Sequence, residues 1–463
     1  MYREGYIAFD FGALSGRMMF GWMQDNKIHL EELHRFENVP VLLGKTLYWD
    51  FLKLFHEMKQ GLKIAATKAI TIKGIAIDTW GVDIGWIDKQ GQLVGNPIHY
   101  RDQRTTKIID EVEEKISEES MYKITGIGKM PFNTIYQLYY DLHKKPCIQE
   151  YADSMLYMPD LFGYYLCGEK YNEYTIASTS GLLNAHTKTY EQVFFEQLNM
   201  HQHCLPKIVL PGTTVGKLTQ EIQEETGLGA IPVIAVASHD TACAVAAAPI
   251  RDDNTAFLIC GTWSLMGMEL TESITTEHAR LAGFTNEGGV NGTVRFLKNI
   301  NGLFFIQKLK KDFEQTDPQI GYPKISRLAS QSKHQYMIDV RDQRFMNPLS
   351  MKKEIQKSVM QNYGVELTSI GDIARVAYNG LVKEYQRTLD ELETITDKKV
   401  HTLCMVGGGI QDAFLCEHVT NTLGINVVKG PVEASVMGNI LMQMQAVGEI
   451  KHIEQGRKLV IND

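Results

Sequence analysis

Short apolar runs separated by turn residues open the chain and predict β-strands. The runs 6–10, 17–23 and 27–33 are divided by the small residues of 12–16 and by Asp25-Asn26. Glycine, serine, Asn and Asp form the tight turns that connect neighbouring strands. We therefore expect a β-meander at the start of the chain.

Helical spacing of apolar residues marks longer segments. One helix is expected to begin after Asp50, which can serve as its N-cap, and another to cover about 373–389. Buried strands are predicted at 73–78, 401–406 and 425–428. Since strands and helices alternate along the chain, the pattern predicts an α/β protein built in layers.

The second half of the chain repeats the opening pattern. A strand at 255–260, a turn at Gly261-Thr262 and a returning strand at 264–270 match the order found in 6–20. Two interpretations stay open, because strand-turn-strand units are also common in unrelated α/β proteins. If the repeat is an internal duplication, a domain boundary is expected within 246–254.

Length and charge narrow the class of protein. The chain has 463 residues, and single hydrophobic cores stop growing at about 250–300 residues, so at least two domains are expected. Lys and Arg number 47 against 55 Asp and Glu, a net charge of -8. A dedicated nucleic-acid-binding domain is normally basic, so that class is disfavoured, whereas a local site for an anionic ligand remains compatible.

Cysteine usage and the apolar segments indicate a cytoplasmic protein. The seven cysteines form no CxxC pair, which favours free thiols over disulfides or a zinc site. No basic region followed by an apolar stretch opens the sequence, so no signal peptide is expected. The most apolar region, 231–250, is interrupted by His239, Asp240 and Pro249 and is too polar to cross a membrane.

Three turns of small residues follow predicted strands and are candidate phosphate sites. Asp10 precedes the turn 12–16, while Gly261-Thr262 and Gly407 to Gly409 stand in similar positions. Backbone N–H groups of such turns can wrap a phosphate, and an aspartate at the strand end can hold a hydrated divalent cation. Each turn could also be purely structural, but together they favour a nucleotide site.

Other motifs are excluded by their details. No GxGxxG follows a predicted strand, which disfavours a Rossmann dinucleotide site. The segment 212–218 is one residue shorter than a Walker A loop and has Leu218 at the position of the Mg²⁺-binding Ser or Thr. Ser238-His239-Asp240 contains the residue types of a hydrolase triad, but three consecutive residues cannot stack into a relay.

Asp240 is the strongest candidate for a catalytic group. It lies within 234–245, an otherwise small and apolar segment between a predicted strand and a predicted helix. Burying a carboxylate there is costly unless it is paired or functional. Asp240 could accept a proton from a substrate hydroxyl. Alternatively, Ser238 or Asp240 could cap the helix.

Two further polar segments are candidates for a sugar site. Segment 78–83 places two acids around Trp80, and an aromatic face beside carboxylates suits a sugar ring and its hydroxyls. The alternative is a turn whose Trp80 packs in the core. Segment 99–104 is also rich in polar groups and could equally be a solvated face.

Taken together, these segments resemble the FGGY family of carbohydrate kinases. Two of them, 78–83 and 237–241, look specific to the branch of the family that acts on L-rhamnulose. The matching segments are 10–17, 33–36, 74–83, 100–105, 131–134, 158–160, 235–241, 261–266, 285–289, 297–300, 406–409 and 430–435.

The resemblance implies a fold of two actin-like (ribonuclease H-like) α/β domains with ATP in a central cleft. The N-terminal domain would cover 1–247 and the C-terminal domain 248–463. The implied reaction is ATP-dependent phosphorylation of the 1-hydroxyl of L-rhamnulose, giving L-rhamnulose 1-phosphate and ADP in rhamnose degradation, with Mg²⁺ as the metal.

The resemblance also implies roles for individual residues. Asp240 falls on the proton acceptor of the family, and Asp10 on its magnesium-associated aspartate. One departure is Leu14, where these kinases usually carry Ser or Thr. The implied substrate residues are Gly81, His239, Asp240, Thr241 and Asn299, and the implied ATP residues are Ala13, Leu14, Ser15, Gly16, Arg17, Thr262, Gln307 and Gly408.

Alternatives remain open at the level of the sequence. An FGGY kinase for another ketose, such as L-fuculose or xylulose, would share most of these motifs. A non-catalytic actin-like nucleotide-binding protein belongs to a different class and would not need Asp240 beside a sugar pocket. The expected partners are a small sugar and ATP, without nucleic acid or membrane, in a monomer or a homodimer.

Overall fold

The expected meander forms one part of a six-stranded sheet. Strands β1 (Arg3–Phe11), β2 (Ser15–Gln24) and β3 (Lys27–Glu37) pair antiparallel, while β6 (Ile70–Thr79) runs parallel to β1. The sheet has the order β11-β12-β6-β1-β2-β3 and is completed by β11 (Thr213–Lys217) and β12 (Pro232–Ala235).

This computed structural model describes residues 3–460, and the chain divides into two units. Unit 1 comprises Met1–Ala247, Glu269–Phe296 and Ala434–Asp463. Unit 2 comprises Ala248–Met268 and Leu297–Glu433. Each unit is therefore assembled from separated stretches of the chain.

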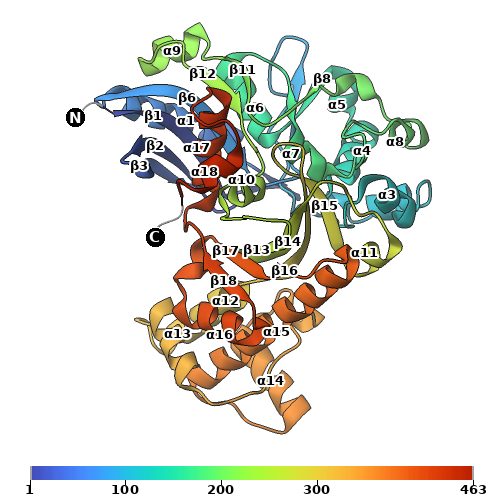
Figure 1. Cartoon of the computed structure of the whole chain (residues 1–463). Helices are drawn as coiled ribbons and strands as arrows, with labels where there is room; N and C mark the ends of the chain where they lie inside the picture. Colours follow the sequence, from blue (N-terminus) through green and yellow to red (C-terminus); the bar gives the residue numbers. More distant parts are fainter. Residues whose placement is uncertain (1–2, 461–463) are drawn as a thin grey trace. The chain divides into compact units, whose positions relative to one another are not determined.

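Helices cover both faces of the sheet in unit 1. Alternate residues of a strand point to opposite faces, and the apolar residues of β1 follow this rule. Phe9 and Phe11 share a core with α1 (Phe51–Ala66) and α6 (Met158–Cys167). Tyr6 and Ala8 pack with α10 (Asp240–Ala247) and α17 (Ala434–Ala446) on the other face. In Figure 1, α17 lies beside α10 against the sheet.

Helix α1 begins as its sequence predicts. The Asp50 side chain accepts a hydrogen bond from the Lys53 N–H at 3.2 Å, and Phe51, Leu54, Met58, Leu62 and Ala65 are buried. The N-cap and the helical spacing of apolar residues therefore agree.

The close packing of α10 and α17 depends on a glycine. A Cβ atom at Gly438 of α17 would lie 1.8 Å from the carbonyl oxygen of Cys243 in α10. Only the absence of a side chain at Gly438 lets the two backbones approach this closely. Helix α17 thus holds α10 against the sheet, and this packing sets the position of Asp240, the first residue of α10.

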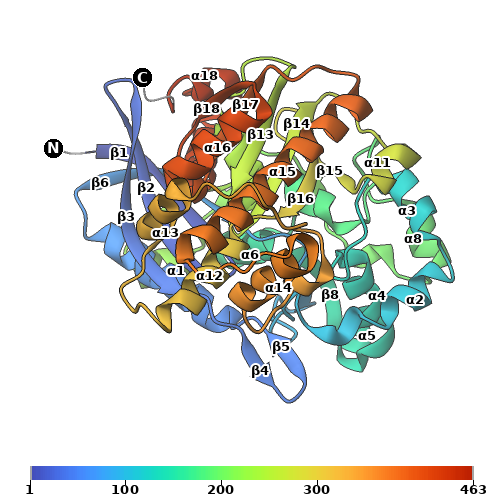
Figure 2. The ribbon, with the colours of Figure 1, turned by 90° about the horizontal axis from the view of Figure 1, so that it is seen from below.

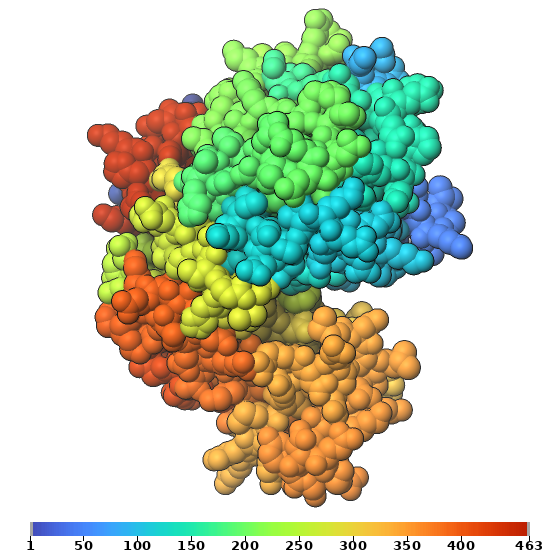
Figure 3. Space-filling view, turned by 90° about the vertical axis from the view of Figure 1, so that its right-hand side faces the viewer, coloured from blue at the N-terminus to red at the C-terminus, as the bar shows by residue number. Residues whose placement is uncertain are grey.

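The remaining elements of unit 1 lie outside its six-stranded sheet and the helices described above. The hairpin of β4 and β5 extends away from the rest of unit 1 (Figure 2). Helix α11 lies beside α3, seen as yellow next to cyan in Figure 3, and Arg280 of α11 pairs with Glu118 of α3. The bounds of these strands are β4 (Val41–Leu43), β5 (Thr46–Tyr48), β7 (Ile84–Asp88), β8 (Ala152–Tyr157), β9 (Asn172–Glu173), β10 (Ile208–Val209) and β15 (Phe284–Gly288). The helices are η1 (Gln103–Thr105), α2 (Ile108–Glu113), α3 (Glu118–Thr125), α4 (Thr134–Lys144), α5 (Pro146–Tyr151), α7 (Tyr174–Ala177), η2 (Ser178–Ser180), α8 (Gln192–Gln197), η3 (Gln202–Cys204), α9 (Gln220–Thr226), α11 (Glu277–Leu281) and α18 (Ile453–Arg457).

Unit 2 repeats the strand order of the first sheet. The second six-stranded sheet has the order β15-β16-β14-β13-β17-β18, with β13 antiparallel to β14 and parallel to β17. Strand β1 has the same relation to β2 and β6, so the repeat seen in the sequence is a repeat of topology. The strands are β13 (Thr255–Cys260), β14 (Trp263–Leu270), β16 (Val294–Asn301), β17 (Thr402–Val406) and β18 (Asn426–Lys429). The helices are α12 (Phe304–Glu314), α13 (Tyr322–Gln331), η4 (Gln343–Phe345), α14 (Met351–Tyr363), α15 (Ile370–Thr396), η5 (Gly408–Gln411) and α16 (Ala413–Leu423).

Two sequence expectations concern the whole described chain. All seven cysteines, from Cys147 to Cys416, are free thiols. Within residues 3–460, none of the helices combines the length and the apolar character that crossing a membrane requires.

Candidate active site

Asp240, the carboxylate that stood out in the sequence, is the first residue of α10. Its Oδ1 accepts a hydrogen bond from the Thr241 hydroxyl at 3.0 Å, and 36% of its side chain is exposed. The Ser238 hydroxyl donates to the Val236 carbonyl at 3.2 Å and does not cap the helix. The Asp240 carboxylate is therefore open to a ligand.

The surroundings of Asp240 make its carboxylate more basic than an ordinary one. Burial raises the pKa of Asp240, and the charge of Asp10 raises it further, whereas hydrogen bonds from Thr241 lower it, as a positive charge on His239 would. Because about a third of the side chain still meets water, solvent moderates this shift. A partly exposed carboxylate with a raised pKa suits a group that accepts a proton from a hydroxyl.

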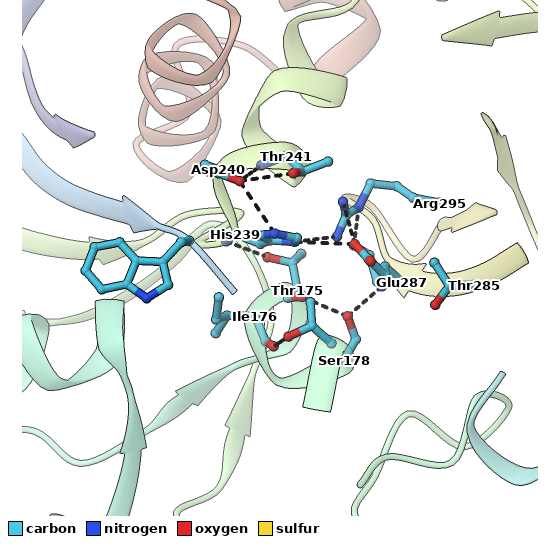
Figure 4. Close-up of polar contacts among 12 residues, drawn as sticks. Thr175, Ile176, Ser178, His239, Asp240, Thr241, Thr285, Glu287 and Arg295 are labelled. Carbon is cyan, nitrogen blue, oxygen red and sulfur yellow. Dashed lines mark hydrogen bonds and ion pairs between the residues drawn. The ribbon is translucent and has the colours of Figure 1, made fainter. Parts of the chain in front are cut away.

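A buried glutamate holds the loop before α10 in place. Glu173 precedes α7, and its Oε1 accepts the Thr175 N–H at 2.8 Å. Its Oε2 accepts from the Thr175 hydroxyl at 2.6 Å and from the N–H groups of Ile176 and Ser238, both at 3.1 Å. The Thr175 hydroxyl oxygen accepts the His239 N–H at 3.3 Å (Figure 4). The loop is thus tied to α7 through its own backbone.

Glu173 shares its buried environment with Asp160. Burial raises the pKa of Glu173 to about 7, while its four hydrogen bonds favour the ionised form. Burial and the charge of Glu173 raise the pKa of Asp160 well above its ordinary value. We therefore assign the proton to Asp160 and the negative charge to Glu173, since two adjacent buried carboxylates cannot both ionise cheaply.

His239 lies between Asp240 and a buried ion pair. Its Nε2 is 3.5 Å from Asp240 Oδ1, and its Nδ1 faces Glu287 of β15 and Arg295 of β16 (Figure 4). No functional role is predicted for Glu287, Arg295 or Glu173 from the sequence. Charged residues inside apolar strand segments were the signal that could have singled out the first two.

Gly81 lies beside His239. The Thr79 N–H donates to the Ser238 carbonyl at 2.9 Å, which joins the end of β6 to the loop before α10. A Cβ atom at Gly81 would lie 3.3 Å from His239 Nε2 and 3.4 Å from the Thr179 hydroxyl. The structure therefore brings together Gly81, His239, Asp240 and Thr241, the predicted substrate residues of unit 1.

The structure supports the second alternative for segment 78–83, a turn whose Trp80 packs in the core rather than a face for a sugar ring. Trp80 is only 6% exposed, and its ring centroid is 3.9 Å from that of Trp49. The indole N–H groups of Trp49 and Trp80 donate to Asp83 Oδ2 at 2.6 and 3.0 Å, and Gln137 donates to Oδ1 at 3.2 Å. Trp80 belongs to the core, and the protein itself satisfies the Asp83 carboxylate.

Val82, next to Gly81, has an unusual backbone conformation. Its φ is 69°, a value that is rare for a β-branched residue. Its carbonyl oxygen accepts hydrogen bonds from the Thr134 hydroxyl at 2.6 Å and from Gln137 at 3.3 Å. Such contacts can hold a strained residue in place, and strain of this kind is often found at functional sites.

Segment 99–104 is only partly a solvated face. The ring of His99 is buried, with its centroid 4.0 Å from that of Trp49, and its Nδ1 accepts the Arg101 N–H at 2.9 Å. Asp102 is also buried, and its Oδ2 accepts the Leu47 N–H at 2.8 Å. Arg101 and Gln103 are exposed. Burial, followed by the charge of Arg101, lowers the pKa of His99 from 6.5 to about 4.

His99 is expected to make the protein less stable in acid. A histidine whose pKa is lower in the folded state contributes stability above pH 6.5, and this is lost as the pH falls towards about 4. The loss is about 3 kcal/mol at 1.36 kcal/mol per pKa unit. His99→Phe should remove this part of the pH dependence of unfolding, measured by denaturant titration across that range. The exposed His278→Phe is the control, and an unchanged pH dependence in His99→Phe would contradict the assignment.

A second pair of carboxylates lies where β1 and β6 end. Asp10 and Asp78 are neighbours in the parallel register of these strands. Asp10 Oδ2 accepts from Arg17 at 2.9 and 2.7 Å and from the Ser435 hydroxyl at 3.3 Å. Asn439 donates to Asp78 Oδ2 at 2.7 Å, whereas the buried Oδ1 of Asp78 accepts no hydrogen bond from any described residue.

The Asp10–Asp78 pair fits a hydrated divalent cation. Burial and the charge of Asp10 raise the pKa of Asp78 well above its ordinary value, so a cation nearby would relieve an unfavourable charge. Residues 3–460 contain no group of three or more His, Cys, Asp or Glu that could hold a metal by itself. Mg²⁺ is commonly bound by one or two carboxylates, with water and phosphate completing its shell, and the unpartnered Oδ1 matches that arrangement.

The predicted phosphate turn joins β1 to β2. The Gly12 N–H donates to the Ser15 carbonyl at 2.9 Å, and the Asn38 N–H donates to the Leu14 carbonyl at 3.1 Å. The Leu14 side chain is 79% exposed, so the departure at this position leaves the backbone of the turn unobstructed. Of the predicted ATP residues, Ala13 and Leu14 lie in the turn, while Ser15, Gly16 and Arg17 begin β2, where Arg17 is bound to Asp10.

The remaining predicted residues lie in unit 2. Thr262, between β13 and β14, and Gln307 of α12 are hydrogen-bonded to each other, with Gln307 Nε2 3.0 Å from the Thr262 hydroxyl. Gly408 begins η5 after β17, and a Cβ atom there would meet nothing within 4 Å. Asn299 lies on β16 and is partly exposed.

Known proteins match this chain over nearly its whole length. A rhamnulokinase from Bacteroides thetaiotaomicron is 38% identical over 459 residues, which covers 99% of this chain and 94% of the relative. A rhamnulokinase from Bacillus subtilis is 37% identical over 458 residues, covering 99% and 93%.

Solved structures of sugar kinases share the fold. A ligand-bound xylulose kinase from Lactobacillus acidophilus has a TM-score of 0.81 at 15% identity, covering 99% of this chain and 93% of the other. Plasmodium falciparum glycerol kinase with ADP has a TM-score of 0.82 at 14% identity, covering 99% and 92%.

Both halves of the chain match one family. Residues 6–246 match the N-terminal domain, and residues 256–447 the C-terminal domain, of the FGGY family of carbohydrate kinases. This family implies ATP use and typically a divalent metal. With two-domain α/β architecture, matches to both family domains and relatives above 30% identity, the chain belongs to the FGGY family of carbohydrate kinases.

Proposed function

We propose that this protein phosphorylates L-rhamnulose at its 1-hydroxyl, using ATP and giving L-rhamnulose 1-phosphate and ADP. The observation that carries the proposal is the position of Asp240, a partly exposed carboxylate of raised pKa at the start of α10, beside His239 and Gly81. The similarity to rhamnulokinases along nearly the whole chain supports this particular sugar.

The proposed roles follow the residues identified in the sequence. Asp240 is the proton acceptor, and Gly81, His239, Thr241 and Asn299 contact the sugar. Along the sequence, residues 1–247 are proposed as the N-terminal FGGY domain and 248–463 as the C-terminal domain, although the later stretches 269–296 and 434–463 belong to unit 1 of the structure. The protein works in the cytoplasm on a small sugar. The residues proposed to bind ATP are Ala13, Leu14, Ser15, Gly16, Arg17, Thr262, Gln307 and Gly408.

Phosphoryl transfer requires mainly that the reacting groups are positioned and that their charge is stabilised. Asp240 would orient the 1-hydroxyl and take its proton as the oxygen attacks the terminal phosphate of ATP. Backbone N–H groups of the turn between β1 and β2 would hold phosphate oxygens. Mg²⁺, held by Asp10 with Asp78 beside it, would supply positive charge to the phosphates when bound.

Gly81→Ala is expected to raise KM for the sugar about tenfold, which corresponds to about 1.4 kcal/mol of binding. Its new methyl group would occupy the space next to His239 Nε2, where the sugar is proposed to bind. Stability and KM for ATP should change little. Steady-state kinetics with each substrate varied in turn measure this. Gly229→Ala, at an open position, is the matched control, and an unchanged sugar KM in Gly81→Ala would remove Gly81 from the site.

A coupled ADP-release assay over a panel of sugars tests the function directly. L-rhamnulose, L-fuculose, xylulose and glycerol are compared by kcat/KM at saturating ATP and Mg²⁺. We expect the highest kcat/KM with L-rhamnulose. A clear preference for another sugar would replace the substrate, and no sugar-dependent ADP release would overturn the proposed activity.

A further inference from the structure

Arg295 is a fully buried arginine next to His239, the histidine proposed to contact the sugar. Arg295 of β16 has no exposed surface, and burying a guanidinium is costly unless its N–H groups are used. Its Nε donates to the Gly288 carbonyl at 2.8 Å, and its Nη1 lies 3.1 Å from Glu287 Oε2. Its Nη2 lies 3.3 Å from Nδ1 of His239 (Figure 4). Nε and Nη2 thus donate hydrogen bonds, whereas Nη1 forms an ion pair with Glu287 without a hydrogen bond.

The chemistry of arginine decides which nitrogen of His239 carries the hydrogen. A guanidinium has only donors and keeps its proton in proteins, so His239 Nδ1 must accept from Nη2 with its lone pair. A neutral imidazole whose Nδ1 accepts carries its hydrogen on Nε2. Nε2 is the nitrogen that faces Asp240 Oδ1 at 3.5 Å and the space beside Gly81.

Glu287 is the other group that could bind His239 Nδ1, by accepting a hydrogen from it, but its carboxylate is already paired with Arg295. Glu287 Oε2 lies 3.4 Å from Nδ1, so a hydrogen on Nδ1 could in principle point there. That hydrogen would also meet the Nη2–H of Arg295, leaving a buried donor without an acceptor. Burial alone would raise the pKa of Glu287, but the charge of Arg295 holds it below its ordinary value. Glu287 therefore stays ionised and serves as the counter-ion of Arg295.

We propose that Arg295 and Glu287 are positioning residues that hold His239 as the neutral tautomer with its hydrogen on Nε2. His239 then donates to a sugar oxygen, and the site selects a substrate with an acceptor oxygen at that point. The consequence for the sugar rests on the proposed function, whereas the tautomer does not.

A neutral His239 also preserves the basicity of Asp240. A positive imidazolium 3.5 Å from the carboxylate would favour its ionised form and weaken it as a proton acceptor. The charged groups that face the imidazole are Asp240 of α10, Glu287 of β15 and Arg295 of β16, and the Thr175 hydroxyl meets the His239 backbone. Arg295 is the single positive group among them and opposes a second positive charge.

Nitrogen-15 NMR of the full-length protein without ligand tests the tautomer. With histidines labelled, long-range proton–nitrogen correlations separate the two ring nitrogens, and the signals missing from His239→Gln identify those of His239. At mildly alkaline pH we expect an unprotonated Nδ1 and a protonated Nε2. A protonated Nδ1 in the wild-type protein would overturn the proposal, whatever the variants do.

The variant Arg295→Met tests whether Arg295 fixes the tautomer of His239. Without the guanidinium, His239 should carry its hydrogen on Nδ1 and donate it to Glu287, so the Nδ1 signal should change from unprotonated to protonated. Adding Glu287→Gln should return the tautomer towards the wild-type form. An unchanged tautomer in Arg295→Met would show that Arg295 does not position His239.

A second buried arginine provides the matched control. Arg457 of α18 is 6% exposed and pairs with Glu269 Oε2 at 2.6 Å, and its other hydrogen bonds go to the carbonyls of Val245 and Ala246. Arg457→Met should cost stability and leave the His239 signals in place, and the same movement of these signals in Arg457→Met would overturn a specific role for Arg295. Finding the expected tautomer in a protein that phosphorylates no sugar would refute the proposed function and leave this inference standing.

Discussion

Asp240→Asn is expected to lower kcat for sugar phosphorylation by about 10²–10⁴-fold, the usual contribution of a positioned general base. Asparagine has the same shape and can keep the contact between Oδ1 and the Thr241 hydroxyl, which is 3.0 Å in the wild-type protein. It cannot take the proton of the sugar hydroxyl. The turn between β1 and β2 is untouched, so ATP binding should remain.

The same variant should not unfold the protein. Because burial raises the pKa of Asp240, this carboxyl contributes stability at low pH that is lost as the pH rises through its folded-state pKa. Replacing it with a neutral amide removes that loss, so the unfolding temperature at neutral pH should stay equal or increase.

Kinetics and unfolding together make the test specific. The kcat is measured by ADP release at saturating sugar and ATP, with binding of ATP checked by calorimetry. Asp50→Asn is the matched control, because it changes another aspartate next to a helix start, where asparagine is an equally good N-cap. A near-normal kcat in Asp240→Asn would eliminate Asp240 as the proton acceptor.

Glu173→Ala is expected to destabilise the protein by about 3–5 kcal/mol, because several buried hydrogen-bond donors would be left without an acceptor. Four donors would lose their acceptor, namely the N–H groups of Thr175, Ile176 and Ser238 and the Thr175 hydroxyl. The kcat should fall about tenfold or more, because a shift of the loop before α10 misplaces Asp240.

Glu173→Gln should behave differently from Glu173→Ala. Its amide oxygen can replace Oε2 and keep three of the four hydrogen bonds, while its NH₂ group would face the Thr175 N–H. We expect a smaller loss of stability and a kcat between those of wild type and Glu173→Ala. Calorimetric unfolding and steady-state kinetics measure both effects.

Glu191, another glutamate that caps a helix, serves as a control to distinguish positioning of the loop from capping alone. Glu191 accepts the Val193 N–H before α8, and its other carboxylate oxygen accepts a hydrogen bond from the Asn184 side chain. Glu191→Ala should cost little stability and no activity. If Glu173→Ala caused equally small losses of stability and kcat, Glu173 would only cap α7 and would not be needed to position the loop before α10.

The local elements of this fold could be predicted from the sequence because their causes are local. The turns between β1, β2 and β3, the N-cap Asp50 and the helical spacing of α1 each depend on residues a few positions apart. Asp240 also stood out, because a carboxylate in an apolar segment is costly wherever that segment folds. The repeated strand-turn-strand pattern indicated the repeated topology.

The partners of these residues could not be predicted in the same way. Trp80 was compatible with a sugar face or with the core, and its contact with Trp49 decides for the core. Glu173 is 65 positions from Ser238, and Arg295 is 56 positions from His239. No spacing rule relates residues this far apart, since strand order and helix packing bring them together.

The sequence by itself thus determined the elements, the repeat, the family resemblance and the carboxylate that the proposed reaction uses. Only the tertiary structure decided how that carboxylate is held, which nitrogen of His239 faces it, and that Asp78 lies beside Asp10 with an unpartnered oxygen. The physical reason is that hydrophobic periodicity and turn chemistry act between near neighbours in the chain. Hydrogen bonding and burial of charge depend on whichever groups the fold places within a few ångströms.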